Sequence, residues 1–377
     1  FYPEKDLVDG KCPLHPTLAP EWIREKNYFF RLSKYREPLV AHFHAHPEFL
    51  QPDNRRNEML RLLEGGLEDI SVSRAGQLWG IPLPFDSGYV TYVWFDALVN
   101  YVTIPAARGD AAVLSALAIP GPKLETGNPQ PDLWPADVHV IGKDILKFHT
   151  VFWPIMLKAM GLALPKQILV HGWWQKDGQR MSKSTGNVVD PLAVIDEWGL
   201  DAFRYYVVRE LDIGPDGNWT DAGFQSRYAA ELANGLGNLV NRSLSMLKRY
   251  RGGIVTARSD ELALEVTAAI DQVRSLLERN QLQGALQTIW GLIARANQYV
   301  DQTAPFKLAK DPSQAQRLDE VLYNLAETCR VLAVLLWPFL PGTAGRIYSQ
   351  LGLVTSPGQF AGAAWGSLAP GHTIGDI

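Results

Sequence analysis

Cysteine is scarce in this sequence, which holds two cysteines, Cys12 and Cys329, among 377 residues. Two cysteines so far apart predict no disulfide framework, and such a count is typical of proteins of the reducing cytoplasm. Long apolar runs are missing as well. The longest strongly apolar stretch, VLAVLLWPFLP from Val331, is shorter than the roughly 20 residues that a transmembrane helix needs, and it contains prolines. We therefore expect a cytoplasmic protein without a membrane segment.

An excess of positive charge is also absent, because the net charge is −4, with 20% charged and 46% apolar residues. This composition is typical of a globular protein, and it excludes binding of nucleic acid through an overall positive charge. Any such contact must come from a local patch of basic side chains. The first residues, FYPEKDLVDG, include neither a methionine nor an apolar signal segment, so we expect the chain to be a piece of a longer protein.

The spacing of apolar residues divides the chain into an α/β part and a helical part. The β-branched runs DVHVIG and QILVHGW are typical of buried parallel strands, and DILKFHTVFWPIMLKAMG between them has helical periodicity. This order predicts a strand–helix–strand unit, followed from about Asp190 by helices without further strands. Long amphipathic helices are predicted from Phe224 to the mid-340s, with breaks at Gly252–Gly253 and Pro305.

One short segment, DGQRMSKSTGN from Asp177, places Lys183 between Ser182 and Ser184 soon after the apolar run QILVHGWW. Parallel sheets bind ligands at the carboxyl ends of their strands, so this loop is expected at the edge of a binding site. An ammonium group flanked by hydroxyl donors suits the oxygens of a polyphosphate. For a lone lysine in a serine-rich loop, a solvated surface loop is the more frequent outcome, so the phosphate site depends on further motifs.

Further along the chain, Asn234, Asn238 and Arg242 are spaced four residues apart, which places them on one face of a helix. Two amides and a guanidinium in a row can read the edges of unpaired RNA bases, and an ordinary exposed polar face is the alternative. Cys12 and His15 have the spacing of half a zinc site. The HFHAHP tract is expected to be a set of solvated histidines rather than a metal site.

Several motifs together resemble a known family. RMSKSTGN after VHGWW resembles the signature loop of class I aminoacyl-tRNA synthetases, Lys-Met-Ser-Lys-Ser, with Arg180 in the first place. YVWFDALVNY, HVIGKDILKFHTVFWP, GNLVNR and DQTAPFKLAK, in this order along nearly the whole chain, narrow the resemblance to the methionyl-tRNA synthetases. The other family signature, of the His-Ile-Gly-His type, is absent from this sequence. We expect it upstream of residue 1, and we expect the chain alone to be impaired in activity.

The resemblance implies site residues, each at the position that matches a family motif. It assigns the phosphates of ATP to the signature loop, and the ribose and adenine to the ends of two strands. It assigns the methionine side chain to an aromatic pocket and the anticodon to helical residues, with Phe306 where the family usually has a stacking tryptophan. By site, the residues are Lys183, Arg180, Ser182 and Ser184 in catalysis; Gly142, Asp144, His171, Trp174 and Met181 in ATP binding; Trp94, Ala97, Tyr101, Ile145 and His149 in methionine binding; and Asn234, Asn238, Arg242 and Phe306 in anticodon binding.

The same resemblance implies the fold: the second half of a doubly wound parallel α/β sheet, followed by an α-helical bundle. Residues 1–85 are predicted to be the remnant of an insertion with a metal knuckle, and residues 86–190 the C-terminal half of the nucleotide-binding domain. Residues 191–222 are predicted to form a helical connection, and residues 223–377 the anticodon-binding bundle.

The implied function is that of a methionine–tRNA ligase, which uses ATP and Mg²⁺ and has methionine and tRNA(Met) as partners. A zinc ion is expected only if the intact protein completes the half site at Cys12 and His15. Two alternatives stay open: a class I synthetase for another aliphatic amino acid, and a tRNA-binding relic without catalysis. The sequence does not predict the oligomeric state.

Overall fold

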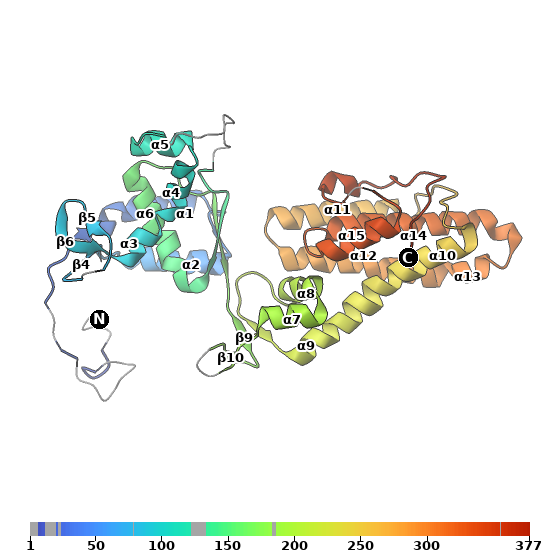
Figure 1. Cartoon of the computed structure of the whole chain (residues 1–377), viewed down its shortest axis with the longest axis horizontal. Helices are drawn as coiled ribbons and strands as arrows, with labels where there is room; N and C mark the ends of the chain where they lie inside the picture. Colours follow the sequence, from blue (N-terminus) through green and yellow to red (C-terminus); the bar gives the residue numbers. More distant parts are fainter. Residues whose placement is uncertain are drawn as a thin grey trace. The chain divides into compact units, whose positions relative to one another are not determined.

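The computed structural model describes residues 7–11, 20–21, 24–77, 79–121, 133–182, 186–354 and 356–377. The chain divides into two compact units, residues 1–169 and residues 170–377. The first unit mixes short strands with helices, and the second is mainly helical (Figure 1). The predicted class, an α/β region followed by helices, is therefore confirmed.

The first unit is built from short elements. Its strands are β1 (Phe29–Phe30), β2 (Leu50–Gln51), β3 (Ile70–Ser71), β4 (Ser73–Ala75), β5 (Pro82–Leu83), β6 (Asp86–Thr91), β7 (Val138–Gly142) and β8 (Gln167–His171), the last of which crosses the division between the units. Its helices are α1 (Arg36–Ala45), α2 (Asp53–Glu64), α3 (Val93–Ala97), α4 (Asn100–Ala107), α5 (Ala111–Leu117) and α6 (Trp153–Met160), with 3₁₀ turns η2 (Leu32–Tyr35) and η3 (Lys143–Ile145) and a π-helical turn η4 (Phe148–Phe152).

One three-stranded sheet of this unit has the order β2–β8–β7. β2 and β8 pair in parallel, with Leu50 opposite Ile168. β8 is buried along its middle, as expected of a parallel strand covered on both faces. Helix α6, which connects β7 to β8, is buried from Trp153 to Leu157. The predicted strand–helix–strand unit is thus present.

The second unit carries the remaining elements. Its strands are β9 (Trp174–Lys176), β10 (Gln179–Arg180) and β11 (Gly217–Trp219). Its helices are α7 (Pro191–Trp198), α8 (Leu200–Glu210), α9 (Asp221–Arg227), the π-helix η6 (Tyr228–Gly237), α10 (Asn238–Arg251), α11 (Ala263–Glu278), α12 (Leu282–Thr303), α13 (Pro305–Leu308), α14 (Ala315–Leu336) and α15 (Pro341–Gln350), with 3₁₀ turns η7 (Pro312–Gln314) and η8 (Phe360–Ala363).

Strand β11 corrects the prediction that no strand follows Asp190. It pairs in parallel with β9, with Gly217 opposite Trp174. At three residues it is too short to show alternation in the sequence. The chain is closely packed at Gly217, where a Cβ would lie 2.5 Å from the Leu211 side chain and 3.2 Å from the Trp174 ring.

Helix α14 is the central helix of the bundle, and it packs beside α10, α12 and α15 (Figure 1). Every residue from Val321 to Leu336 is buried. The apolar run at Val331 therefore belongs to a protein core, and among the described residues no helix has the length and apolar character to cross a bilayer. The predicted breaks are confirmed: α10 ends before Gly252, which has φ +62°, and α13 begins at Pro305.

The bundle also buries an ion pair that fastens the C-terminal segment. Glu327 Oε1 accepts hydrogen bonds from Arg330 Nε at 3.0 Å and Nη2 at 2.7 Å. The Glu327 carboxylate further accepts from the backbone N–H groups of residues 366, 367 and 368. Arg330 donates to the carbonyl oxygens of Gly362 and Ala364. Both buried charges are thus paired and further stabilised by hydrogen bonds, as a buried ion pair requires.

Candidate functional site

A hydrogen-bonded chain joins three of the residues predicted to bind methionine. The Tyr101 hydroxyl lies 2.9 Å from His149 Nε2, and His149 Nδ1 lies 3.1 Å from the Ile145 carbonyl oxygen. Tyr101 comes from α4, Ile145 ends η3, and His149 lies in η4. The structure therefore brings together side chains that are up to 48 residues apart in the sequence.

Burial keeps this chain of groups uncharged. The His149 side chain is 3% exposed, and burial lowers its pKa, an effect that the hydrogen bond to Ile145 partly opposes. Burial also raises the pKa of Tyr101. Because a carbonyl oxygen can only accept, Nδ1 of the neutral imidazole carries the proton and Nε2 accepts from the Tyr101 hydroxyl. The resulting surface is polarizable and neutral, which suits an apolar ligand.

The remaining predicted pocket residues lie in neighbouring turns of the first unit. Trp94 stacks on Phe148, the residue before His149, with ring centroids 4.2 Å apart and an interplanar angle of 17°. Trp94 also lines a small apolar cavity together with Phe95 and Phe152. Ala97 lies one turn after Trp94, at the end of α3. Aromatic rings thus lie beside both Trp94 and Tyr101, and the role of these two residues in methionine binding stays a prediction.

Two further aromatic groups belong to this cluster and were missed from the sequence. His139 lies under Tyr101, with ring centroids 4.4 Å apart, and its Nε2 accepts a hydrogen bond of 3.2 Å from Trp153 Nε1. His139 is 6% exposed, and burial, with repulsion from His149, lowers its pKa to about 4. Its place on β7 gave no signal, because an alternating strand pattern does not show which ring stacks on which.

The π-helical turn η4 places His149, and the sequence carried one sign of it. Pro154 has no N–H, and in a regular helix its ring would collide with the carbonyl group four residues earlier, at Thr150. The π-helical turn at Phe148–Phe152 accommodates this proline at the start of α6. Such turns are rare and often occur at functional sites, so Pro154 after an aromatic run could have indicated one.

Two predicted nucleotide-binding residues lie where β7 ends. Gly142 is the last residue of β7, and Asp144 follows in the 3₁₀ turn η3 with an exposed side chain. This is the strand end at which α/β proteins bind ligands. Asp144 is also one residue before Ile145, whose carbonyl orients His149. A short segment of the chain thus connects the predicted ribose and methionine positions.

In the second unit, the signature segment follows a small platform of three strands. β9 and β10 form an antiparallel hairpin, and β11 adds to β9 on the other side. The ends of the loop are held together: Ser182 N–H donates to the Asn187 carbonyl oxygen at 3.2 Å, and Asn187 Nδ2 donates to the Lys176 carbonyl oxygen at 3.3 Å. Lys183 and Ser184 lie outside the described residues, as do Cys12 and His15. The predicted catalytic residues Arg180 and Ser182 come just before Lys183 in the chain and are described.

The other predicted residues of this region take different positions. His171 ends β8 with an exposed side chain, and its Nδ1 is 2.8 Å from the Gly172 carbonyl oxygen. Trp174 and Met181 instead pack against an apolar cluster around Tyr206. The Trp174 ring centroid lies 6.1 Å from that of Tyr206. The Trp174 ring is therefore occupied by packing, and the role of this residue in ATP binding stays a prediction.

The predicted anticodon residues span the junction of two helix types. Asn234 lies in the π-helix η6, whereas Asn238 and Arg242 lie in α10. Both asparagines are exposed. Arg242 is partly buried and donates from Nη2 to Asp301 Oδ1 at 3.0 Å. Phe306, 45% exposed, follows shortly after Asp301, beyond the end of α12.

The π-helix η6 has its own support, which the sequence did not reveal. Trp290 Nε1 donates to the Glu231 carbonyl oxygen at 3.4 Å, and Asn297 Nδ2 donates to the Gly235 carbonyl oxygen at 3.2 Å. Both donors come from α12. Side chains of α12 therefore satisfy carbonyl groups of the wider helix, which holds Asn234 at the start of the exposed row.

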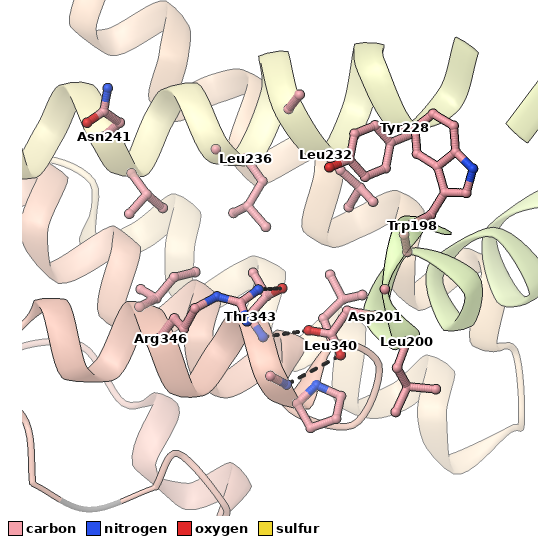
Figure 2. Close-up of a pocket in the computed structure, with 18 of the residues that line it drawn as sticks. Trp198, Leu200, Asp201, Tyr228, Leu232, Leu236, Asn241, Leu340, Thr343 and Arg346 are labelled. Carbon is pink, nitrogen blue, oxygen red and sulfur yellow. Dashed lines mark hydrogen bonds between the residues drawn. The ribbon is translucent and has the colours of Figure 1, made fainter. Parts of the chain in front are cut away.

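A cavity of about 610 Å³ between α8, η6, α10 and α15 contains none of the predicted site residues (Figure 2). Asp201 lies in it and accepts hydrogen bonds from the backbone N–H groups of Gly342 and Thr343 at the start of α15 (Figure 2).

The HFHAHP tract is not simply solvated, because His42 is half-buried and packs edge-on against Phe49, with ring centroids 4.6 Å apart. Among the described residues, no three His, Cys, Asp or Glu side chains are grouped to hold a metal ion.

Comparison with known proteins assigns both parts of the chain. A family model described as tRNA synthetases class I (M) matches residues 2–244, and one described as the anticodon binding domain of methionyl tRNA ligase matches residues 250–375. Methionine–tRNA ligase of Caldanaerobacter subterraneus subsp. tengcongensis is 42% identical over 380 residues, covering 99% of this chain and 57% of that relative. The Bacillus subtilis methionine–tRNA ligase is 43% identical over 375 residues, covering 94% and 54%.

Solved structures of a methionyl-tRNA synthetase are also similar to this chain. Mycobacterium tuberculosis methionyl-tRNA synthetase in complex with methionyl-adenylate superimposes with a TM-score of 0.83 at 36% identity, covering 94% of this chain and 68% of that one. The apo form of the same protein gives a TM-score of 0.82 at 35% identity, covering 95% and 68%. The chain spans a little over half the length of the curated relatives it matches.

Proposed function

The chain belongs to the family of class I tRNA synthetases for methionine, and on that premise we propose that the whole protein is a methionine–tRNA ligase. In the first step, a carboxylate oxygen of methionine attacks the α-phosphorus of ATP and pyrophosphate leaves. In the second, a hydroxyl of the 3′-terminal ribose of tRNA attacks the carbonyl carbon of methionyl-adenylate and AMP leaves. The observation that carries the proposal is the hydrogen bond between Tyr101 and the buried His149, beside the stacked Trp94 and Phe148.

Recognition of methionine follows from the chemistry of this pair. The methionine side chain is unbranched, apolar and polarizable, and its sulfur is a weak acceptor that favours aromatic edges. An apolar ligand would remove water from a charged histidine, which costs free energy. The buried His149 is neutral at pH 7, so binding does not carry this cost. Ala97 and Ile145 supply the aliphatic wall. Leucine, isoleucine and valine lack the sulfur, so their discrimination depends on pocket shape and on these contacts.

The nucleotide is assigned to strand ends and to the signature loop. We propose that the Asp144 carboxylate accepts from the ribose hydroxyls beside Gly142, and that the backbone at His171 and Trp174 lies along the adenine. Arg180, Ser182, Lys183 and Ser184 are proposed to donate to the phosphate oxygens as pyrophosphate leaves. Such donors lower the barrier because they stabilise charge that develops in the transition state.

The two metal ions of this proposal, Mg²⁺ and zinc, rest on different arguments. Mg²⁺ binds few protein groups when phosphates supply its ligands, so it can enter on ATP, and the part of the chain that the structure describes offers it no cage. Zinc at Cys12 and His15 stays a prediction from the sequence, as does a cytoplasmic location. The tRNA is assigned to the exposed face of Asn234, Asn238 and Arg242, with Phe306 stacking on a base.

Transfer of labelled methionine to tRNA by the whole protein tests this function. Lys183→Ala should abolish most of the charging and leave tRNA binding within about twofold, because the loop acts on ATP phosphates. Lys34→Ala, an exposed lysine of η2, is the matched control and should charge normally. Charging with another aliphatic amino acid, or binding of tRNA without any charging, would replace the proposal by one of the two alternatives.

A further inference from the structure

The start of the signature loop is stacked on a tryptophan. The guanidinium carbon of Arg180 lies 4.5 Å from the centroid of the Trp173 ring. In the β9–β10 hairpin, Arg180 is opposite Gln175, so Trp173 is its diagonal neighbour two residues away on the same face. A guanidinium at this distance is attracted to the face of an indole ring.

Trp173 is itself fixed by its backbone. Its N–H donates to Asp216 Oδ1 at 2.9 Å, and its carbonyl oxygen accepts from Gly217 N–H at 2.8 Å. The preceding Gly172 passes so close to Pro215 that a Cβ would lie 2.0 Å from the Pro215 carbonyl oxygen. Residues 215–217 therefore hold Trp173 in place through both its N–H and its carbonyl group.

The Arg180 side chain is exposed, and among the described residues no carboxylate forms an ion pair with it. Stacking occupies the face of the guanidinium but not the N–H groups in its plane. Those N–H groups lie at the start of the segment whose ends are joined by the Ser182–Asn187 hydrogen bond. This is a suitable arrangement for bidentate binding of phosphate oxygens.

We propose that Trp173 is a positioning residue for ATP: it stacks under Arg180 and presents the guanidinium edge to the departing pyrophosphate. The inference rests on the proposed function. It explains the Arg180 that replaces lysine in the first place of the motif, because a flat guanidinium covers an indole ring and still offers paired donors, whereas an ammonium is a point charge. Trp173 acts through Arg180 and need not touch the nucleotide.

Steady-state ATP–pyrophosphate exchange by the whole protein tests the inference, with Trp173→Leu, Arg180→Gln and the double variant. Trp173→Leu should raise KM for both ATP and pyrophosphate about three- to fivefold, which is the range of an exposed cation–π contact. KM for methionine, tRNA binding and thermal stability should stay unchanged. In the Arg180→Gln background, Trp173→Leu should have less than about a twofold further effect, because the two residues act as one unit.

Two variants sharpen the result. Trp173→Phe keeps a ring and should recover most of the ATP affinity, whereas Trp79→Leu removes a tryptophan that is 91% exposed and should change no constant. The inference is overturned if Trp173→Leu and Arg180→Gln act additively, or if Trp173→Leu changes thermal stability and all KM values together. An unmodified protein without exchange activity would overturn the proposed function, whereas normal exchange by Trp173→Leu would overturn this inference alone.

Discussion

The buried His139 is expected to make the first unit less stable as the pH falls. Burial lowers the pKa of His139 to about 4 from an ordinary value of 6.5. The unfolded chain therefore binds a proton at a pH where the folded chain does not, and stability falls as the pH drops from 7 through 6.5 toward 4. Between pH 7 and pH 5 this one group should remove about 2 kcal/mol, at about 1.4 kcal/mol for each pKa unit crossed.

The matched variant is His139→Gln, whose side-chain oxygen can still accept from Trp153 Nε1 and which does not titrate. Hydrogen exchange of amides in β7 and α6, read peptide by peptide at pH 5, 6 and 7, reports the opening free energy of this unit by itself. The difference between pH 7 and pH 5 should shrink by about 2 kcal/mol in the variant. Equal pH dependence in both proteins would refute the assignment of a buried neutral imidazole.

Three further changes follow from the same structure. Tyr101→Phe removes the hydroxyl that donates to His149. Loss of one hydrogen bond, about 1 kcal/mol, should raise KM for methionine about fivefold and leave KM for ATP unchanged. Pyrophosphate-exchange kinetics measure both constants. Arg242→Ala should weaken tRNA binding about tenfold in filter binding and leave pyrophosphate exchange intact, a separation that would fail if Arg242 were only structural. Glu327→Gln leaves a buried charge unpaired and should lower stability by about 3–5 kcal/mol in denaturant unfolding. Glu320→Gln, in a partly exposed pair on the same helix, should lower it by less than about 1 kcal/mol, and equal losses would contradict the role of burial.

The broad architecture was predictable because it is recorded in periodicity and composition. Apolar β-branched runs around a helical segment indicated the strand–helix–strand unit, and glycine and proline marked the ends of α10 and the start of α13. The three-residue strand β11 was not predictable, because it is too short to show alternation, and the close packing at Gly217 is a property of the folded chain.

The candidate site was predictable only in part, and for a related reason. Motif positions identified Tyr101 and His149, but the hydrogen bond between them comes from helices that the sequence does not place side by side. His139 and Trp153 were missed because their roles arise from stacking within a buried cluster. The π-helix η4 depends on Pro154, and the π-helix η6 depends on partners such as Trp290. The spacing of apolar residues alone predicts an ordinary α-helix at both places.

The central claim is that the whole protein activates methionine. ATP–pyrophosphate exchange, measured with methionine, leucine, isoleucine and valine at equal concentrations, tests it most directly. The account predicts exchange that depends on methionine, with the other three amino acids at least about a hundredfold less effective in kcat/KM, and loss of exchange in Lys183→Ala. Exchange that is as fast with leucine, isoleucine or valine, or that survives in Lys183→Ala, would contradict it.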